Sequence, residues 1–314
     1  MKNGKITEML GIKYPVFQGG MAWVADAELA AAVSDAGGLG IIAAGNADGD
    51  YVRAQIRKAK ELTDKPFGLN IMLLSPFVDD VAQIAADEKV AVVTTGAGNP
   101  TKYMQLWKEA GIKVIPVVPS IAFAKLAARS GASAVIAEGG ESGGHIGELT
   151  TMALVPQVAD AVDIPVIAAG GIADGRGVAA AFALGADAVQ IGTRFLSAKE
   201  CNIHENYKKK VLMAGDTATM VTGRRLGHPV RSIRNQFARE YAKIEYTDIS
   251  DQELDEFAAG RLRQAVVDGD EKNGCFLAGQ IAAMVTQEQT CQEIIDDLMS
   301  DADRVLTKLA GLCE

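Results

Sequence analysis

Short apolar runs recur along the first 200 residues of the chain, each followed by a loop and an alanine-rich stretch of helical composition. A short run of branched or small apolar residues is typical of a strand that is buried on both faces. The eight runs are 15–18, 39–43, 67–71, 91–94, 113–118, 134–137, 166–169 and 188–191. Helices are predicted between them, for example at 27–36, 51–62, 101–110, 121–130 and 179–184.

Glycines after several of the predicted helices support this division. Gly37, Gly111 and Gly131 each stand shortly before an apolar run. A glycine ends a helix there because it adopts the left-handed conformation without strain. One unit takes roughly 20 to 30 residues, the length that a strand, a turn, a helix and a second turn require. Eight such units fit a closed barrel better than an open sheet, so we predict an α/β protein with a (β/α)8 TIM barrel.

The seventh and eighth predicted strands end in turns that carry almost no side chains. Gly170-Gly171 follows the seventh strand and Gly192-Thr193 follows the eighth, with Gln190 inside that strand. Backbone N–H groups in two such neighbouring turns suit a phosphate, and the corresponding loops of (β/α)8 barrels bind phosphates. The alternative is that the glycines only make tight turns.

The loop after the sixth predicted strand carries the candidate catalytic residue. His145 stands among five glycines in the run from Glu138 to Gly147, at the catalytic end of a barrel strand. An imidazole there can donate a proton near neutral pH or hydrogen-bond a developing enolate. The alternative is a polar loop residue without a catalytic role. The histidines, cysteines and acidic residues have no convincing metal-binding spacing, so any metal site stays unknown.

Two further loops complete the predicted pocket. Gln18-Gly19-Gly20-Met21-Ala22-Trp23 follows the first strand, and its exposed peptide groups and thioether suit stacking against a planar ring. Asn70 ends the third strand, where its amide can donate to and accept from a ring such as the pyrimidine edge of a flavin. Either loop alone is equally consistent with barrel packing. Together with the phosphate turns they describe a ligand of the shape of FMN, whereas a Rossmann site is unsupported because no GxGxxG motif follows a strand.

Composition limits the function further. The chain has 314 residues, of which 48% are hydrophobic, and no apolar run is long enough to span a bilayer. No secretory signal pattern occurs at 1–20, so we expect a cytoplasmic protein without a membrane partner. The four cysteines, Cys201, Cys275, Cys291 and Cys313, are interpreted as free thiols. The net charge of −9 argues against nucleic acid as a partner.

The residues after the eighth strand form two further segments. We expect 1–200 to be the barrel, 201–285 a smaller lid segment over the ends of the strands, and 286–314 a final helix that packs back on the barrel. Nine lysines and arginines against two acids lie between 207 and 243. Arg231 and Arg234 are expected to share one helix face. The cluster is either solvated surface or a site that attracts a phosphorylated cofactor or an acidic carrier protein.

Several long motifs resemble a known family. They are QGGMAWVAD at 18–26, FGLNIMLLSP at 67–76, TTGAGNP at 94–100, GGHIGELTTM at 143–152, and IPVIAAGGIADG with VQIGTRF. This set is similar to the FMN-dependent enoyl-acyl-carrier-protein reductase II, within the nitronate monooxygenase (2-nitropropane dioxygenase) group. The resemblance spans essentially the whole barrel and continues more loosely through 227–236. Ser142 departs from the family, whose loop more often has alanine there.

The resemblance implies that NAD(P)H reduces bound FMN, which then passes hydride to the β-carbon of a trans-2-enoyl thioester on acyl carrier protein. His145 would stabilise or protonate the enolate. Stimulation by a monovalent cation is also implied, without a site that side chains reveal. A homodimer is compatible with the sequence, which does not itself determine the oligomeric state. The implied cofactor-binding residues are Gly20, Met21, Ala22, Asn70, Glu138, Gly143, Gly144, Gly170, Gly171, Gln190, Gly192 and Thr193.

Two other functions remain open. A nitronate-oxidising flavoprotein would use the same FMN and histidine but pass electrons to oxygen. The full matches at 18–26 and 70–76 favour the reductase. A non-catalytic phosphate-binding sensor or scaffold is disfavoured by His145 and the open glycine-rich mouth. An inosine-monophosphate-dehydrogenase-like barrel is disfavoured because it needs a loop cysteine, and none occurs between Met1 and Glu200.

Overall fold

The computed structural model describes residues 4–312, and eight parallel strands form its central sheet. The sheet has the order β1-β9-β8-β6-β5-β4-β3-β2, and a parallel bridge between Phe17 and Leu39 joins its two edges. The predicted (β/α)8 barrel is therefore confirmed. Its strands are β1 (Val16–Gln18), β2 (Gly40–Gly45), β3 (Phe67–Met72), β4 (Val92–Gly96), β5 (Lys113–Val118), β6 (Val135–Glu138), β8 (Val166–Ala169) and β9 (Ala188–Ile191).

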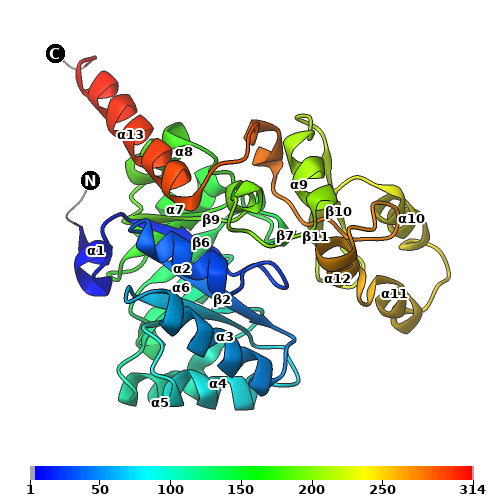
Figure 1. The fold of residues 1–314 in the computed structure, drawn as a ribbon, viewed down its shortest axis with the longest axis horizontal. Helices are drawn as coiled ribbons and strands as arrows, with labels where there is room; N and C mark the ends of the chain where they lie inside the picture. Colours follow the sequence, from blue (N-terminus) through cyan, green and yellow to red (C-terminus); the bar gives the residue numbers. More distant parts are fainter. Residues whose placement is uncertain (1–3, 313–314) are drawn as a thin grey trace.

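Helices connect successive strands and surround the barrel (Figure 1). They are α2 (Ala27–Asp35), α3 (Gly49–Leu62), α4 (Val78–Asp87), η1 (Pro100–Tyr103), α5 (Met104–Glu109), α6 (Ile121–Ser130), α7 (Thr151–Ala159) and α8 (Gly175–Ala183). Aspartates cap the first turns of three of them, because each carboxylate accepts a backbone N–H of that turn. The capping residues are Asp26, Asp48 and Asp174. The glycines predicted to end helices adopt positive φ, for example 79° at Gly111 and 87° at Gly131.

The barrel interior is a packed core rather than a channel. Phe17, Ile41, Val92 and other strand residues meet there, and Ile6 joins them from helix α1 (Lys5–Leu10). These interior residues occupy alternate positions of their strands, as the two-residue period of a strand requires. Polar side chains that follow on the same faces must therefore lie at the open end of the barrel.

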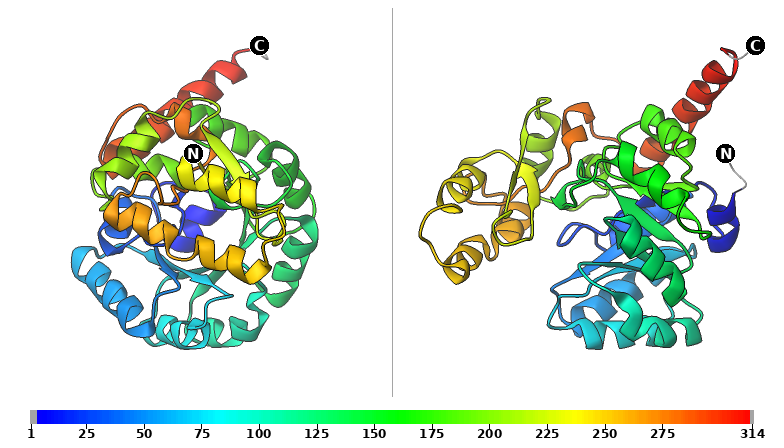
Figure 2. Two further views of the ribbon diagram at one scale, coloured as in Figure 1. Left: turned by 90° about the vertical axis from the view of Figure 1, so that its right-hand side faces the viewer. Right: turned by 180° about the vertical axis from the view of Figure 1, so that it is seen from behind.

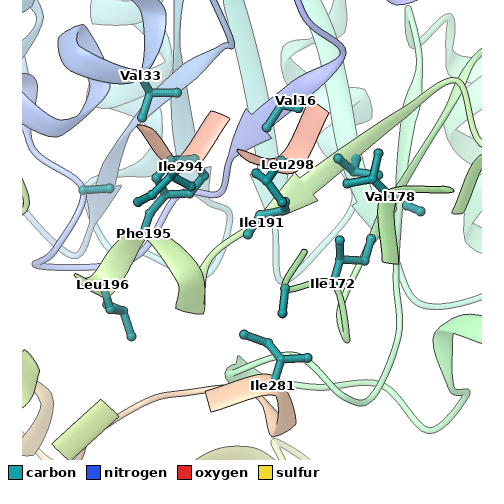
Figure 3. Close-up of a cluster of buried hydrophobic side chains, with 14 of the residues drawn as sticks. Val16, Val33, Ile172, Val178, Ile191, Phe195, Leu196, Ile281, Ile294 and Leu298 are labelled. Atoms are coloured by element: carbon teal, nitrogen blue, oxygen red, sulfur yellow. The ribbon is translucent and has the colours of Figure 1, made fainter. Parts of the chain in front are cut away.

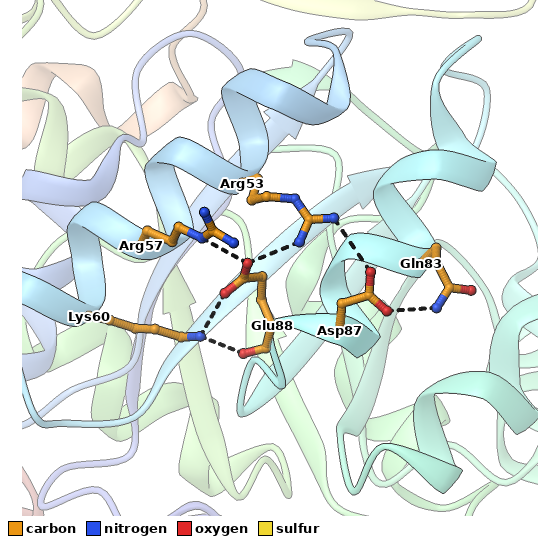
Figure 4. A network of polar contacts seen from close by, with 6 residues as sticks. All are labelled: Arg53, Arg57, Lys60, Gln83, Asp87 and Glu88. Atoms are coloured by element: carbon orange, nitrogen blue, oxygen red, sulfur yellow. Dashed lines mark hydrogen bonds and ion pairs between the residues drawn. The ribbon is translucent and has the colours of Figure 1, made fainter.

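Charged side chains join α3 to the end of α4 on the outer surface, as Figure 4 shows. The carboxylate of Glu88 accepts hydrogen bonds of 3.0 Å from each of Arg53, Arg57 and Lys60. Arg53 also contacts Asp87 at 3.4 Å. Pairs of this exposure contribute little individually, so we treat the network as an orienting contact between the two helices.

The chain after the barrel strands forms a separate group of elements. These are η2 (Thr193–Ser197), α9 (Glu205–Leu212), β10 (Thr219–Thr222), β11 (Val230–Ile233), α10 (Gln236–Ile244), α11 (Asp251–Ala258), α12 (Arg261–Arg263), the π-helical η3 (Gln264–Asp268) and η4 (Gln280–Met284). Figure 2 shows that most of them lie across one end of the barrel, in front of the ring of helices. Phe237, Tyr241 and Leu254 give this lid segment (residues 201–285) a small apolar core of its own.

The last helix, α13 (Cys291–Ala310), returns to the outside of the barrel. It packs between α8 and α2. Figure 3 shows Ile294 and Leu298 of this helix among Val16, Ile191 and Val178. Burial of such aliphatic side chains against the strands stabilises this position. Within residues 4–312, no helix has the length and apolarity needed to cross a membrane.

Candidate functional site

The loops after β1 and β3 meet at the open end of the barrel. A Cβ atom added to Gly20 would lie 2.3 Å from the Cβ of Asn70, so the peptide of Gly20 packs directly against that side chain. Only glycine allows this approach. The Oδ1 of Asn70 accepts a hydrogen bond of 2.9 Å from Thr94. This contact leaves the Nδ2 of Asn70 without an acceptor among the described residues, and therefore available to a ligand.

Two more predicted site residues lie beside this pair. Gln190 follows the interior residue Ala188 on the same face of β9, and its side chain lies 3.3 Å from where a Cβ of Gly19 would be. The Sδ of Met21 lies 3.5 Å from a Cβ built on Gly192. The loop after β1 therefore contacts both β3 and β9, which brings the predicted ring and phosphate positions to one mouth.

The two predicted phosphate turns expose peptide N–H groups. Gly170 and Gly171 both have positive φ, 90° and 73°, which turns their backbones out of the strand direction. The N–H groups of Gly170, Gly171 and Gly192 have no hydrogen-bond acceptor within residues 4–312. Neighbouring free N–H groups of this kind form an anion-binding concavity. The arrangement fits a phosphate.

His145 does not lie in an irregular loop. Gly144–His145 forms a short strand, β7, which lies beside β11 (Figure 1). The two strands pair antiparallel, with Val230 opposite His145 and Arg231 opposite Gly144. The N–H of Ile146 continues the ladder by donating to the carbonyl of Pro229 at 3.0 Å. The lid segment therefore supplies the backbone that holds the candidate catalytic residue.

The electrostatic surroundings of His145 favour its neutral form. Burial of the ring among protein atoms lowers the pKa of His145 from its ordinary value, and the nearby His228 lowers it further. The residue as a whole nevertheless remains exposed to solvent. A neutral imidazole at pH 7 keeps one N–H donor and one acceptor nitrogen. It can hydrogen-bond a developing oxyanion without carrying a net charge itself.

Glu138 is a half-buried carboxyl group at the end of β6. It ends β6 two residues after the interior residue Ile136, and so faces the mouth. Desolvation raises the pKa of Glu138 to about 7, although a hydrogen bond of 3.2 Å from the hydroxyl of Ser142 opposes the shift. Near neutral pH this residue can therefore either donate or accept a proton. Strongly shifted groups in a cleft are typical of functional sites.

Glu141 is a residue of this site that the sequence did not single out. Its carboxylate accepts hydrogen bonds from the N–H of Thr151, at 2.9 and 3.0 Å, and from the hydroxyl of the same residue at 3.0 Å. A carboxylate at the N-terminus of α7 is stabilised by the helix dipole. A Cβ on Gly171 would lie 3.4 Å from the Cβ of Glu141. No local sequence signal reveals this contact, because the partner lies ten residues away.

The lid segment also contacts the remaining predicted residues. The hydroxyl of Thr193 accepts a hydrogen bond of 2.8 Å from the N–H of Gly279. A Cβ on Gly143 would lie 2.8 Å from the nitrogen of that same glycine. The carbonyl of Glu141 accepts the N–H of Gln280 at 2.9 Å. The segment at 278–280 thus fastens the histidine loop to the turn after β9.

The predicted helix carrying Arg231 and Arg234 is wrong. Residues 230–233 form β11, so the two arginines do not share a helix face. The reason is the pairing of this segment with β10 and β7, which no helical periodicity can indicate. Arg231 is half-buried and bonds to the carbonyl of Gly140, whereas Arg234 is exposed.

Three of the four cysteines lie in the described part of the chain. Cys201, Cys275 and Cys291 are free thiols, while Cys313 lies outside the described residues. Burial raises the pKa of Cys201 and Cys275 to about 12, so both are unreactive thiols near neutral pH.

The described part of the chain contains no group of three or more histidine, cysteine or acidic side chains placed to hold a metal ion. The cation site implied by the resemblance stays a prediction.

Comparisons with known proteins place this site in context. The chain is 50% identical to FabK from Thermotoga maritima, whose structure matches with a TM-score of 0.97 over 99% of this chain and 100% of that one. It is 35% identical to (3aS,4S,5R,7aS)-5-hydroxy-7a-methyl-1-oxo-octahydro-1H-indene-4-carboxyl-CoA dehydrogenase of Mycobacterium tuberculosis, over 98% of both chains. It is 31% identical to a probable nitronate monooxygenase of Staphylococcus saprophyticus, over 97% of this chain and 99% of that protein.

These relatives carry the names of oxidoreductases, and they match along almost their full lengths. The family model described as nitronate monooxygenase covers residues 3–88 and 75–301, which include every predicted site residue. The chain belongs to the nitronate monooxygenase family.

Proposed function

We propose that this protein is an FMN-dependent enoyl-acyl-carrier-protein reductase that uses NAD(P)H. The observation that carries the proposal is the likeness to FabK, an enoyl-acyl-carrier-protein reductase II, at 50% identity over 99% of this chain. The similarity to a probable nitronate monooxygenase is 31%. The motifs at 18–26, 67–76 and 143–152, which resemble the reductase, contribute Gly20, Asn70 and His145 from strand ends or the segments that follow them.

The residues at the mouth fit FMN. Its phosphate needs hydrogen-bond donors, which the free N–H groups of Gly170, Gly171 and Gly192 supply. Its ring needs a flat surface, which the peptide of Gly20 provides, and the side chain of Met21, beside Gly192, would pack against the ring. The free amide of Asn70 suits the polar edge of the ring. Further donors and acceptors come from Glu138, Gln190 and Thr193, while Ala22, Gly143 and Gly144 are further proposed contacts of the ring and ribityl side.

When bound, FMN would supply the redox chemistry, accepting hydride from reduced nicotinamide and delivering it to the β-carbon of the enoyl thioester. The protein's own contribution is to orient the thioester and to manage the proton. As the β-carbon gains hydride, negative charge develops on the thioester oxygen, and the N–H of neutral His145 stabilises it. Water would then supply the proton that the α-carbon takes up, which gives the saturated thioester. Catalysis of this kind follows from hydrogen bonds placed in advance at the developing charge.

The substrate would arrive on acyl carrier protein, which is acidic. Exposed positive charge in the lid segment, including Arg234, is suited to receive it.

A monovalent cation remains part of the proposal, with backbone carbonyls as its ligands. The runner-up function is nitronate oxidation, which would require the same cofactor and histidine.

The proposal is tested by turnover with two substrates. Purified protein is given a short trans-2-enoyl thioester with NADH or NADPH, with and without oxygen, and separately a propyl nitronate with oxygen. We expect oxidation of the nicotinamide that depends on the enoyl thioester and persists without oxygen. Rapid nitronate oxidation with no enoyl reduction would reject the reductase in favour of the second function.

A further inference from the structure

We propose that Arg231 of the lid segment is a positioning residue for His145. Its guanidinium group binds the carbonyl of Gly140, while its own strand, β11, pairs with β7. Together these two contacts, which we call the clamp, hold His145 in place. The inference deepens the proposed function, on which its kinetic part rests. Its structural part can be tested without any turnover.

The contacts of Arg231 reach both sides of the histidine loop. Its Nη2 and Nε donate to the carbonyl of Gly140 at 2.9 and 3.3 Å, and its Nη1 contacts the hydroxyl of Thr219 at 3.3 Å. Its backbone stands opposite Gly144 in the β7–β11 ladder. One residue therefore fixes the loop at Gly140, on the β6 side, and again at Gly144, next to His145.

The loop needs such a clamp because of its composition. Five of the ten residues from Glu138 to Gly147 are glycine, the residue with the greatest backbone freedom. Glycine permits the close approaches seen here, such as that of Gly143 to Gly279, but it does not itself select one conformation. The side chain of Glu141 orders the middle of the loop through Thr151. The N–H of Gly140 donates to the carbonyl of Leu149 at 2.8 Å, whereas the carbonyl of Gly140 accepts only from Arg231 among the described residues.

The guanidinium group is suited to this task. A planar fork can direct two N–H groups at one carbonyl, whereas a lysine offers a flexible point charge. Arg231 is half-buried, and this desolvation lowers its pKa from the ordinary value. The carboxylate of Glu141 opposes that shift, and Arg224 adds to it. Three of its nitrogens already have acceptors in the protein. Arg231 is therefore committed to the loop rather than free to attract an anionic partner.

The test compares R231M and R231K with R239M, which removes the same charge from an exposed position in α10 of the same lid segment. A short enoyl thioester of N-acetylcysteamine serves as substrate, because it carries no phosphate and no carrier protein. We expect R231M to lower kcat by about tenfold to a hundredfold, the usual result of small misplacement of a catalytic group, with little change in KM. R231K should recover part of kcat, and R239M should match the wild type.

A second readout follows His145 itself. The chain has three histidines, so the ring signal of His145 in an NMR spectrum of ¹⁵N-histidine-labelled protein is identified by its loss in H145A. We expect R231M to move this signal, R231K to move it less, and the signal of His204 to stay in place in both. If R231M merely unfolds, all three histidine signals will move and its thermal transition will be lost. In that case the comparison of R231K with the wild type provides the test.

The outcomes separate the two proposals. If the wild type reduces no enoyl thioester but R231M moves the His145 signal, the proposed function fails and the clamp stands. If the wild type is active while R231M keeps its kcat and its His145 signal, the clamp is refuted. An increase in KM alone would also overturn it, because Arg231 would then be a substrate-binding residue.

Discussion

A carboxyl group that titrates near neutral pH is the most unusual single residue at the mouth. Glu138 faces the barrel opening, and the structure gives it one hydrogen bond, from Ser142. Desolvation of the half-buried carboxyl group raises its pKa to about 7 from an ordinary value of 4.5. The protonated acid can donate a hydrogen bond to a ligand, which the carboxylate cannot do.

The raised pKa predicts a pH-dependent stability. Between pH 4.5 and about 7 the folded protein holds a proton on Glu138 that the unfolded chain releases, so stability falls as the pH rises through this range. Relative to E138Q, the wild type should lose up to about 3 kcal/mol of its free energy of unfolding, and the loss should level off above pH 8. Urea unfolding of both proteins at pH 5 and pH 8 measures it. Equal changes in the two proteins would mean that Glu138 titrates normally.

His145 gives the second prediction at this scale. H145A should lose enoyl reduction by about a hundredfold or more, because the donor to the developing oxyanion is removed. FMN binding should persist, since the phosphate turns are formed by other strands. Turnover and flavin content are measured on the same preparation. Turnover unchanged in H145A would remove this residue from the mechanism.

At the scale of elements, the site depends on backbone conformations that glycine alone adopts easily. Gly171 has a φ of 73°, and its Cβ would make only an ordinary contact, 3.4 Å, with Glu141. Gly111 has a φ of 79°, with nothing within 4 Å of its Cβ, at the opposite end of a βα unit. Any residue other than glycine would therefore meet the same backbone strain at both positions, but only the first lies at the predicted phosphate.

This pair allows a matched test of the phosphate turn. G171A and G111A should each lose about 1–2 kcal/mol of stability through left-handed backbone strain. Only G171A should also raise the Kd for FMN, by about tenfold, because its methyl group enters the space beside the free N–H groups. Thermal denaturation and FMN titration of the apoprotein provide the two values. Similar FMN affinity in both variants would place the phosphate elsewhere.

The elements also show which features a sequence can reveal. The strands at 113–118, 166–169 and 188–191 were predicted with their observed bounds, because strands of a closed parallel barrel are buried on both faces and read as continuous apolar runs. The two-residue strand β7 was missed, since Gly144 and His145 form a strand only through pairing with distant β11. The contacts of Arg231 with Gly140 and of Glu141 with Thr151 depend in the same way on tertiary structure.

At the scale of the whole molecule, the lid segment and the barrel meet at the candidate site rather than beside it. β11 extends the histidine loop into a three-stranded sheet, and Gly279 bonds to Thr193 after β9. A further contact joins the two parts at the rim, where the guanidinium of Arg263 lies 5.8 Å from the ring of Trp23. Trp23 is exposed and has a positive φ of 64°, a strained conformation for a bulky residue.

The exposed charge of the lid segment leads to a prediction about the carrier. R234Q should raise KM for an enoyl thioester on acyl carrier protein by about twofold to tenfold, because loss of a rim charge weakens steering of an acidic partner. The same variant should be unchanged with the N-acetylcysteamine thioester. Added salt should reduce the difference between wild type and variant. Equal KM values with the carrier-bound substrate would make Arg234 ordinary solvated surface.

The central claim is that a flavin held by peptide groups at the barrel mouth serves an enoyl thioester, and one anaerobic experiment tests it most directly. FMN-loaded protein is reduced chemically, mixed with a trans-2-enoyl thioester in the absence of oxygen, and followed by its visible absorbance. We predict that the yellow absorbance of the oxidised flavin returns, with one saturated thioester formed per flavin. A protein that binds no FMN, or a flavin that stays reduced until oxygen is admitted, would contradict the account.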